Sequence, residues 1–295
     1  MADQKRIQRF LNRLREGFLI SDGAMGTTLS EGGHEPGRPL ELLNVEQPDL
    51  VRAAHRAYLE AGADIITTNT FQGTRPVLER HELGQRTGEL NAAGAQLARE
   101  VAGDRVFVAG DIGPTGKILE PYGDYPEDAA REAFAEQAEA LVEGGADLFI
   151  VETFVAIEEV RAAVTAAAAT GLPVAACMAF DPSGRTAFGV TPGAAAQAME
   201  AAGASIVGAN CGAVSSAEMV DVIAEFRAAT SLPLIAQPNA GRPQRTESGT
   251  AYPETPEMMA DSAERFRGIG VAIIGACCGS TAEHIRAMAE RLRGR

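Results

Sequence analysis

Three of the four cysteines in the sequence stand at the ends of apolar runs, where a strand would stop. Cys211 closes the run SIVGANCG, and Cys277 with Cys278 closes VAIIGACCG. Three convergent thiolates are a ligand set typical of Zn²⁺, and they leave a fourth coordination position open for a substrate. Free cysteines are also often small buried hydrophobic residues. We interpret these three as metal ligands, and Cys177, inside PVAACMAF, as a packing residue.

The two adjacent thiols, Cys277 and Cys278, pose a geometric problem. A disulfide between them would be strained, and disulfides are rare in a reducing cytosol. Neighbouring side chains of a regular strand point to opposite faces, so both sulfurs reach one metal only if the chain bends. Gly275 and Gly279 flank the pair and permit such a bend. The sequence therefore predicts that the backbone of 275–279 departs from strand geometry.

Carboxylates end other apolar runs. Asp22 ends the first, Asp111 lies near the end of the third and Glu152 near the end of the fourth. A buried glutamate without a cation is costly, which favours a functional role for Glu152. Together with Asp22 it could grip a substrate ammonium group, although Asp22 could instead cap a turn. Asp111 is left open between a hydrogen bond within its loop and a contact with substrate.

The four histidines fall on expected loops or helices and not at strand ends. We interpret them as surface or packing residues. His34, in the first long loop, is the one whose role we leave open.

The positions of these residues depend on the elements that hold them. Eight short runs are almost continuously apolar, which is typical of parallel strands covered on both faces; they span 18–22, 64–71, 106–113, 147–154, 173–180, 205–212, 233–240 and 271–279. The stretches between them carry helix-start signals: prolines at first helical positions, N-cap threonines and capping boxes. These signals are Pro48, Pro126, Pro192, Pro256, Thr191, Thr255, Ser215 with Glu218, and Ser280 with Glu283.

Strict alternation of eight strands and helices predicts a (β/α)8 TIM barrel, whose active site lies at the C-terminal ends of the strands. A doubly wound sheet is the alternative, but DGAMGT after the first run lacks its Gly-rich phosphate loop. We expect a single domain over residues 1–295, with a short N-terminal helix covering one end. Three long connections, 23–47, 113–126 and 241–254, are expected to form binding loops.

Composition narrows the class of protein. Apolar residues make up 45% and charged residues 22% of the chain, as in ordinary globular proteins. The net charge of −14 argues against a nucleic-acid surface. The few cysteines and the polar N-terminus, without a signal peptide, predict a cytoplasmic protein. No apolar run approaches the ~20 residues that a membrane span needs.

Together, six stretches resemble the homocysteine S-methyltransferase family, in the family's order and over nearly the whole chain. They are DGAMGT, EAGADIITTNTF, GDIGPTGK, GANCG, QPNAG and GACCGS. The sequences DGAMGT and QPNAG are most similar to those of the homocysteine-binding barrel at the start of cobalamin-dependent methionine synthase.

The resemblance implies a set of roles. Cys211, Cys277 and Cys278 would bind zinc, with the sulfur of homocysteine as fourth ligand. Asp22 and Glu152 would hold the amino group of homocysteine. Backbone N–H groups near Gly23 would bind the carboxylate of homocysteine, with Thr70 nearby. Asn239 would coordinate the metal while substrate is absent. These eight residues are the candidate site.

The methyl donor is not given by these motifs. Methionine synthase carries further folate, cobalamin and activation domains, and no D-x-H-x-x-G cobalamin signature occurs in this sequence. We therefore expect the donor to be methylcobalamin on a separate corrinoid protein. The alternatives are S-methylmethionine, S-adenosylmethionine or betaine as donor, or a thiol other than homocysteine as acceptor.

Two other classes remain open at this point. One is an unrelated barrel enzyme, such as a lyase or a Schiff-base aldolase. The chain has only two lysines, Lys5 and Lys117, which counts against the aldolase. The other is a non-catalytic module that binds zinc or a corrinoid protein.

Overall fold

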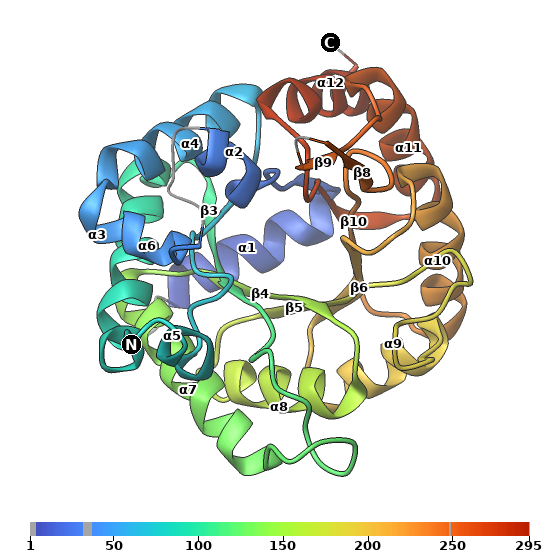
Figure 1. Cartoon of the computed structure of the whole chain (residues 1–295). Helices are drawn as coiled ribbons and strands as arrows, with labels where there is room; N and C mark the ends of the chain where they lie inside the picture. The colour runs from blue at the N-terminus through green and yellow to red at the C-terminus, as the bar shows by residue number, and fades with distance from the viewer. Residues whose placement is uncertain (1–3, 32–36, 248, 295) are drawn as a thin grey trace.

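The computed structural model describes residues 4–31, 37–247 and 249–294 and contains an eight-stranded parallel sheet in the order β1-β10-β7-β6-β5-β4-β3-β2. An isolated parallel bridge between Ser21 and Ile65 joins its first and last strands, and Asp22 N donates to Ile65 O at 3.0 Å. The sheet is therefore a closed barrel, as predicted (Figure 1). The strands are β1 (Leu19–Ile20), β2 (Ile65–Thr67), β3 (Phe107–Ile112), β4 (Leu148–Phe154), β5 (Val174–Met178), β6 (Ile206–Asn210), β7 (Leu234–Gln237) and β10 (Val271–Ile274).

A ring of helices surrounds the barrel, with one long helix after each strand (Figure 1). Apolar side chains between the helices and the strands form the main core, where buried area supplies most of the stabilisation. The helices of the ring are α4 (Pro48–Ala61), α6 (Thr87–Ala102), α7 (Glu127–Gly144), α8 (Ile157–Ala168), α9 (Pro192–Ala201), α10 (Ser216–Ala229), α11 (Pro256–Ile269) and α12 (Ala282–Arg293).

Most of the predicted helix starts are confirmed. Thr191 and Thr255 are N-caps whose hydroxyls accept from the backbone of the first turn, and Ser215 forms a full capping box with Glu218. Pro126 is itself the N-cap of α7, one residue before the position expected for it.

The capping box predicted for Ser280 and Glu283 is wrong. The N-cap of α12 is Thr281, whose hydroxyl and backbone N–H meet the ring nitrogen of His284. Ser280 is drawn away from the helix because its hydroxyl donates to Cys277 O at 2.7 Å and accepts from Ala24 N at 3.1 Å. Tertiary contacts with the neighbouring loops therefore override the local pattern.

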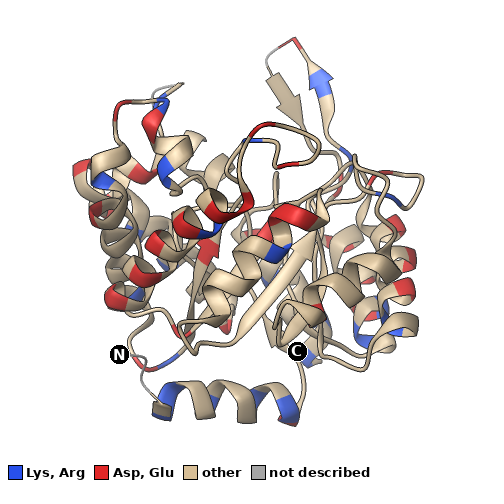
Figure 2. Cartoon of the chain, turned by 90° about the horizontal axis from the view of Figure 1, so that it is seen from below, with Lys and Arg blue, Asp and Glu red and all other residues tan. Residues whose placement is uncertain are grey.

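Helix α1 (Gln4–Glu16) closes the N-terminal end of the barrel, as expected (Figure 2). Phe10 is fully buried and meets Phe107 of β3 edge to face, with ring centroids 5.3 Å apart. Cys177 belongs to the same apolar cluster inside the barrel. Its packing role agrees with the sequence interpretation, and it does not join the other cysteines.

The long loops lie at the opposite end. The first contains α2 (Met25–Glu31), η1 (Leu40–Leu42) and α3 (Leu43–Glu46), while α5 (Arg75–Glu79) and η2 (Gly84–Arg86) follow β2. An exposed hairpin of β8 (Gln244–Thr246) and β9 (Gly249–Ala251) projects from this end (Figure 2). Across the described residues, no helix combines the length and apolarity needed to cross a membrane.

Candidate active site

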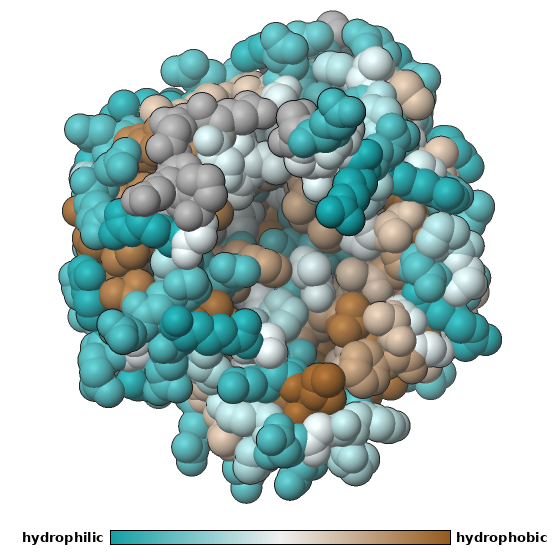
Figure 3. All heavy atoms as spheres, in the orientation of Figure 1, coloured by the Kyte–Doolittle hydropathy of each residue, from teal (hydrophilic) through white to brown (hydrophobic). Residues whose placement is uncertain are grey.

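A cavity of about 300 Å³ opens at the C-terminal ends of the strands. The face that contains it is hollowed near its centre (Figure 3). Among the described residues, its lining holds three thiols and four carboxylates but no lysine, arginine or histidine. These groups are Cys211, Cys277, Cys278, Asp22, Glu41, Asp111 and Glu152. A buried site of this composition suits positively charged ligands.

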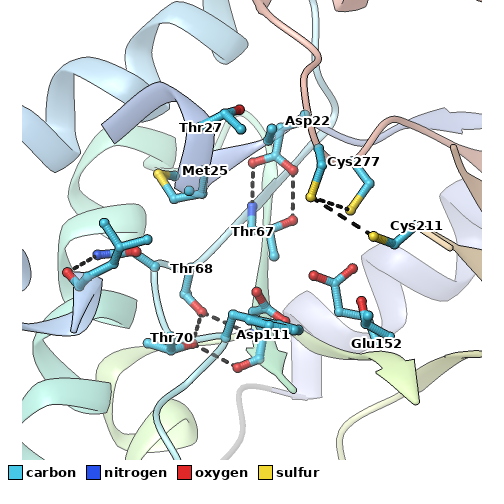
Figure 4. A pocket seen from close by; sticks show the side chains of 18 of the residues that line it. Asp22, Met25, Thr27, Thr67, Thr68, Thr70, Asp111, Glu152, Cys211 and Cys277 are labelled. Carbon is cyan, nitrogen blue, oxygen red and sulfur yellow. Dashed lines mark hydrogen bonds between the residues drawn. The ribbon is translucent and has the colours of Figure 1, made fainter. Parts of the chain in front are cut away.

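The three thiols converge as the sequence predicts (Figure 4). Their sulfur atoms all lie within 4.8 Å of one another, and Cys278 Sγ is 4.0 Å from both Cys211 Sγ and Cys277 Sγ. A tetrahedron with Zn–S bonds of ~2.3 Å has edges of about 3.8 Å. The donor set and its spacing therefore fit a zinc ion.

Backbone bends bring these sulfurs together. Strand β10 ends at Ile274, Cys278 and Gly279 form a turn, and Gly279 has a φ of +77°. The predicted departure of 275–279 from strand geometry is confirmed. Cys211 follows β6 with a φ of +52°, a left-handed conformation that is costly for a non-glycine residue. Such strain is common at functional sites.

Without a metal, the thiols compete for protons. Hydrogen bonds from Cys211 and Cys277 lower the pKa of Cys278 to about 3. Hydrogen bonds with Cys211 and Cys278 raise the pKa of Cys277 well above its ordinary value. One thiolate is thus stabilised by two thiols, and full deprotonation of all three needs a cation.

Asp22 and Glu152 flank the thiols (Figure 4). Burial raises the pKa of Asp22 to about 7, although hydrogen bonds from Thr67 oppose the shift. Burial, and then the charges of Cys278 and Asp22, raises the pKa of Glu152 to about 8. A positive group between these carboxylates would restore their charged forms. The arrangement therefore suits an ammonium ion next to a metal-bound sulfur.

The other candidate residues lie in different settings. Gly23 lines the cavity, and a Cβ there would meet Ser280 Oγ at 2.5 Å. Thr70 also lines the cavity, but its hydroxyl donates to Asp111 O at 2.8 Å. Asn239 is buried outside the lining: its Nδ2 donates to Gly212 O at 2.9 Å, while Oδ1 has no partner.

Asp111 also faces the cavity, where its Oδ1 is buried without a partner. Burial, followed by the charge of Glu152, raises its pKa well above the ordinary range. His55 is fully buried with no partner on either ring nitrogen, and burial lowers its pKa to about 4. His55, His81 and His284 agree with the packing or surface interpretation, while His34 lies outside the described residues.

Sequence reasoning missed three residues of the site. Thr67 binds both oxygens of Asp22, and Asn210 binds Glu152. Glu41 lines the cavity with one carboxylate oxygen unpartnered, and burial raises its pKa to about 7. Asn210 was recognisable as the strand-end amide before Cys211. Glu41 gave no signal, because it lies in a loop whose docking is a tertiary property.

Known proteins are similar to this chain over nearly its whole length. The sequence model of a family described as homocysteine S-methyltransferase matches residues 19–292. Methionine synthase of Mycobacterium leprae is 32% identical over 95% of this chain, and that of Mycobacterium tuberculosis is 33% identical over 95%. The matches cover 24% and 25% of those proteins. The chain thus spans about a quarter of the length of these relatives.

Solved structures show the same fold. The metallated form of the homocysteine methyltransferase MmuM from Escherichia coli matches with a TM-score of 0.80 and 22% identity, covering 97% of this chain and 99% of that one. Its oxidized form matches with a TM-score of 0.77 and 24% identity, covering 93% and 96%. At these identities the likeness concerns the barrel alone.

Proposed function

The chain belongs to the homocysteine S-methyltransferase family, and on that basis we propose that it transfers a methyl group to the thiol of homocysteine, giving methionine. One observation supports this most directly: three convergent thiols and two buried carboxylates, Asp22 and Glu152, line the same cavity. A thiol and an ammonium group on one small molecule would match both halves of this site.

We propose that Cys211, Cys277 and Cys278 hold a zinc ion. When bound, zinc lowers the pKa of a coordinated thiol and keeps its sulfur nucleophilic at neutral pH. The three sulfurs would supply three negative charges. The left-handed backbone of Cys211 and the turn at Cys278 hold these sulfurs in place before substrate arrives. No general base is needed during the transfer, which fits a lining without histidine among the described residues.

Asp22 and Glu152 would orient the substrate through its ammonium group. Their raised pKa values mean that the empty site prefers at least one of them protonated. An arriving ammonium group would favour both charged forms and so fix the sulfur near the thiols. In this proposal the backbone at Gly23 binds the carboxylate of homocysteine, with Thr70 nearby. Asn239 coordinates the metal in the absence of substrate.

We propose methylcobalamin on a separate corrinoid protein as the methyl donor. The resemblance to the first barrel of cobalamin-dependent methionine synthase supports this choice, as do the relatives named methionine synthase. S-methylmethionine, S-adenosylmethionine and betaine are the alternatives. We further propose that residues 1–295 form one domain.

A donor panel tests the proposal. Zinc-loaded protein is mixed with homocysteine and each donor in turn, and methionine is quantified. We expect turnover with methylcobalamin, free or on a corrinoid protein. Turnover with a sulfonium donor alone would overturn the choice of donor. Zinc binding without methionine from any donor would instead favour a non-catalytic module.

A further inference from the structure

Asn210 is a buried amide that contacts both halves of the candidate site. It is the last residue of β6, and its side chain lies inside the barrel mouth with no exposed surface. Nδ2 donates to Glu152 Oε2 at 2.9 Å and reaches Cys277 Sγ at 3.9 Å. The same group therefore touches an expected ammonium ligand and an expected metal ligand.

The oxygen of the same amide binds the backbone of β4 where this strand is irregular. The pairing of β4 with β5 shifts register between Val151 and Phe154, and Thr153 within this bulge has a φ of +66°. Asn210 Oδ1 accepts from Thr153 N at 2.8 Å, and Nδ2 donates to Thr153 Oγ1 at 2.8 Å. Bulges near active sites commonly redirect a side chain. Here the bulge accompanies the turn of Glu152 toward the cavity.

These contacts also fix the orientation of the amide. A backbone N–H needs the oxygen of Asn210, and the carboxylate of Glu152 needs its nitrogen. The nitrogen is then the atom that faces Cys277, where an N–H donor stabilises a thiolate. With the amide turned over, Thr153 N and Glu152 Oε2 would both lose their partner. The two N–H groups of Nδ2 are shared among Glu152 Oε2, Thr153 Oγ1 and, at the longest distance, Cys277 Sγ.

We propose that Asn210 is a positioning residue that couples the metal half of the site to the ammonium half. It holds Glu152 in the cavity by hydrogen bonding and by fixing the bulge at Thr153. It also donates toward Cys277, as partners of metal ligands commonly do. This inference rests on the proposed binding of zinc and homocysteine.

Two variants separate its contacts. Asn210→Ala removes all of them, whereas Asn210→Asp keeps an oxygen for Thr153 N but places a second negative charge beside Glu152. Asn91→Ala is the control, since Asn91 is also fully buried, lies outside the cavity lining, donates to Gly73 O and Thr87 O, and accepts from Gln137 Nε2. A general loss of buried polar contacts would affect the control as well.

The test measures binding of two thiols to zinc-loaded protein by calorimetry: homocysteine, and 4-mercaptobutyrate, which lacks the amino group. Zinc affinity is measured by competition with a chelator. For both Asn210 variants we expect the preference for homocysteine over 4-mercaptobutyrate to fall about tenfold or more, because neither side chain donates to Glu152 and the new carboxylate of Asn210→Asp repels Glu152 from its position. We expect Asn210→Ala to weaken zinc binding by about 10–100-fold, the usual range for such partners. Asn91→Ala should change neither quantity.

Equal weakening of both thiols would overturn the coupling, because a purely structural role predicts it. An unchanged preference together with unchanged zinc affinity would also overturn it. If Asn210→Ala does not fold, the thiol preference of Asn210→Asp shows whether Asn210 positions Glu152 for the ammonium group. If the unaltered protein binds zinc but not homocysteine, the proposed function fails, and the zinc measurements still decide the contact with Cys277.

Discussion

Thr67 holds Asp22 by two hydrogen bonds, one from its backbone N–H and one from its hydroxyl, each 2.7 Å long and ending on a different carboxylate oxygen. Thr67 is the last residue of β2, and Asp22 follows β1. The pair therefore bridges the seam where the barrel closes. It also lowers the cost of keeping Asp22 charged in a buried cavity.

Thr67→Val should test this relationship. Losing the hydroxyl raises the pKa of Asp22 above about 7, so a higher pH is needed before the carboxylate is charged and can bind an ammonium group. Homocysteine affinity at pH 7 should fall about tenfold, as for other hydrogen bonds to charged groups. Its pH dependence should shift toward alkaline values in calorimetric titrations from pH 6 to 9. Thr67→Ser keeps the hydroxyl and should resemble the unaltered protein; an unshifted profile for Thr67→Val would contradict the role.

Glu41 should make the metal-free protein less stable at high pH. Burial raises its pKa from 4.5 to about 7, so the folded state binds this proton more tightly than the unfolded chain does. Its contribution to stability is full below pH ~4.5 and is lost as the pH rises to about 7. Glu41→Gln keeps an oxygen for Gln72 N and removes the titration.

The variant should therefore be more stable than the unaltered protein at pH 8, by roughly 1–3 kcal/mol. The two proteins should converge near pH 5. Urea unfolding at both pH values measures the difference. A stability difference that does not depend on pH would show that the carboxyl of Glu41 is not the titrating group.

The barrel was predictable because its signals are local. Each strand is a short apolar run, and N-caps such as Thr191 and Thr255 follow from neighbouring residues alone. The thiols could be brought together from sequence because alternation fixes the order of strands, and β7 alone separates β6 from β10. The bend after β10 was predictable because neighbouring side chains of a regular strand point to opposite faces, so Cys277 and Cys278 can meet at one site only if the chain bends.

The rest of the site depends on tertiary contacts. Ser280 looks like an N-cap, but its hydroxyl joins Cys277 to the loop after β1, so Thr281 takes that role. Glu41 enters the cavity because the loop around it docks on the end of β2, where Asn69 Nδ2 donates to Leu40 O at 2.8 Å. No local pattern encodes either contact.

Phe10→Ala should destabilise the fold without altering the site. Phe10 is fully buried between α1 and β3, and truncating such a side chain typically costs about 3–5 kcal/mol. Because α1 lies at the end opposite the cavity, affinity for homocysteine at low temperature should not change. Thermal unfolding and calorimetry measure the two effects. Arg13→Ala, on the exposed side of α1, should change stability by no more than about 0.5 kcal/mol.

Cys277→Ala and Cys177→Ala form a matched pair. Cys277 Sγ lies in the sulfur triad, whereas Cys177 is fully buried in the apolar cluster inside the barrel. Removing one of three sulfurs should abolish stoichiometric zinc binding, because two thiolates leave the tetrahedral set incomplete. Removing Cys177 should leave zinc content at one ion per chain and only lower the melting temperature.

Metal analysis after dialysis against a weak chelator measures zinc, and methionine formation measures activity. We expect Cys277→Ala to lose both and Cys177→Ala to keep both. Full zinc and full activity in Cys277→Ala would show that the triad is not the metal site. Loss of zinc from Cys177→Ala as well would mean that the measurement reports general unfolding, and circular dichroism on both variants distinguishes that case. Because the two substitutions remove the same atoms from one barrel, once inside the sulfur triad and once outside it, their difference isolates the position of the sulfur.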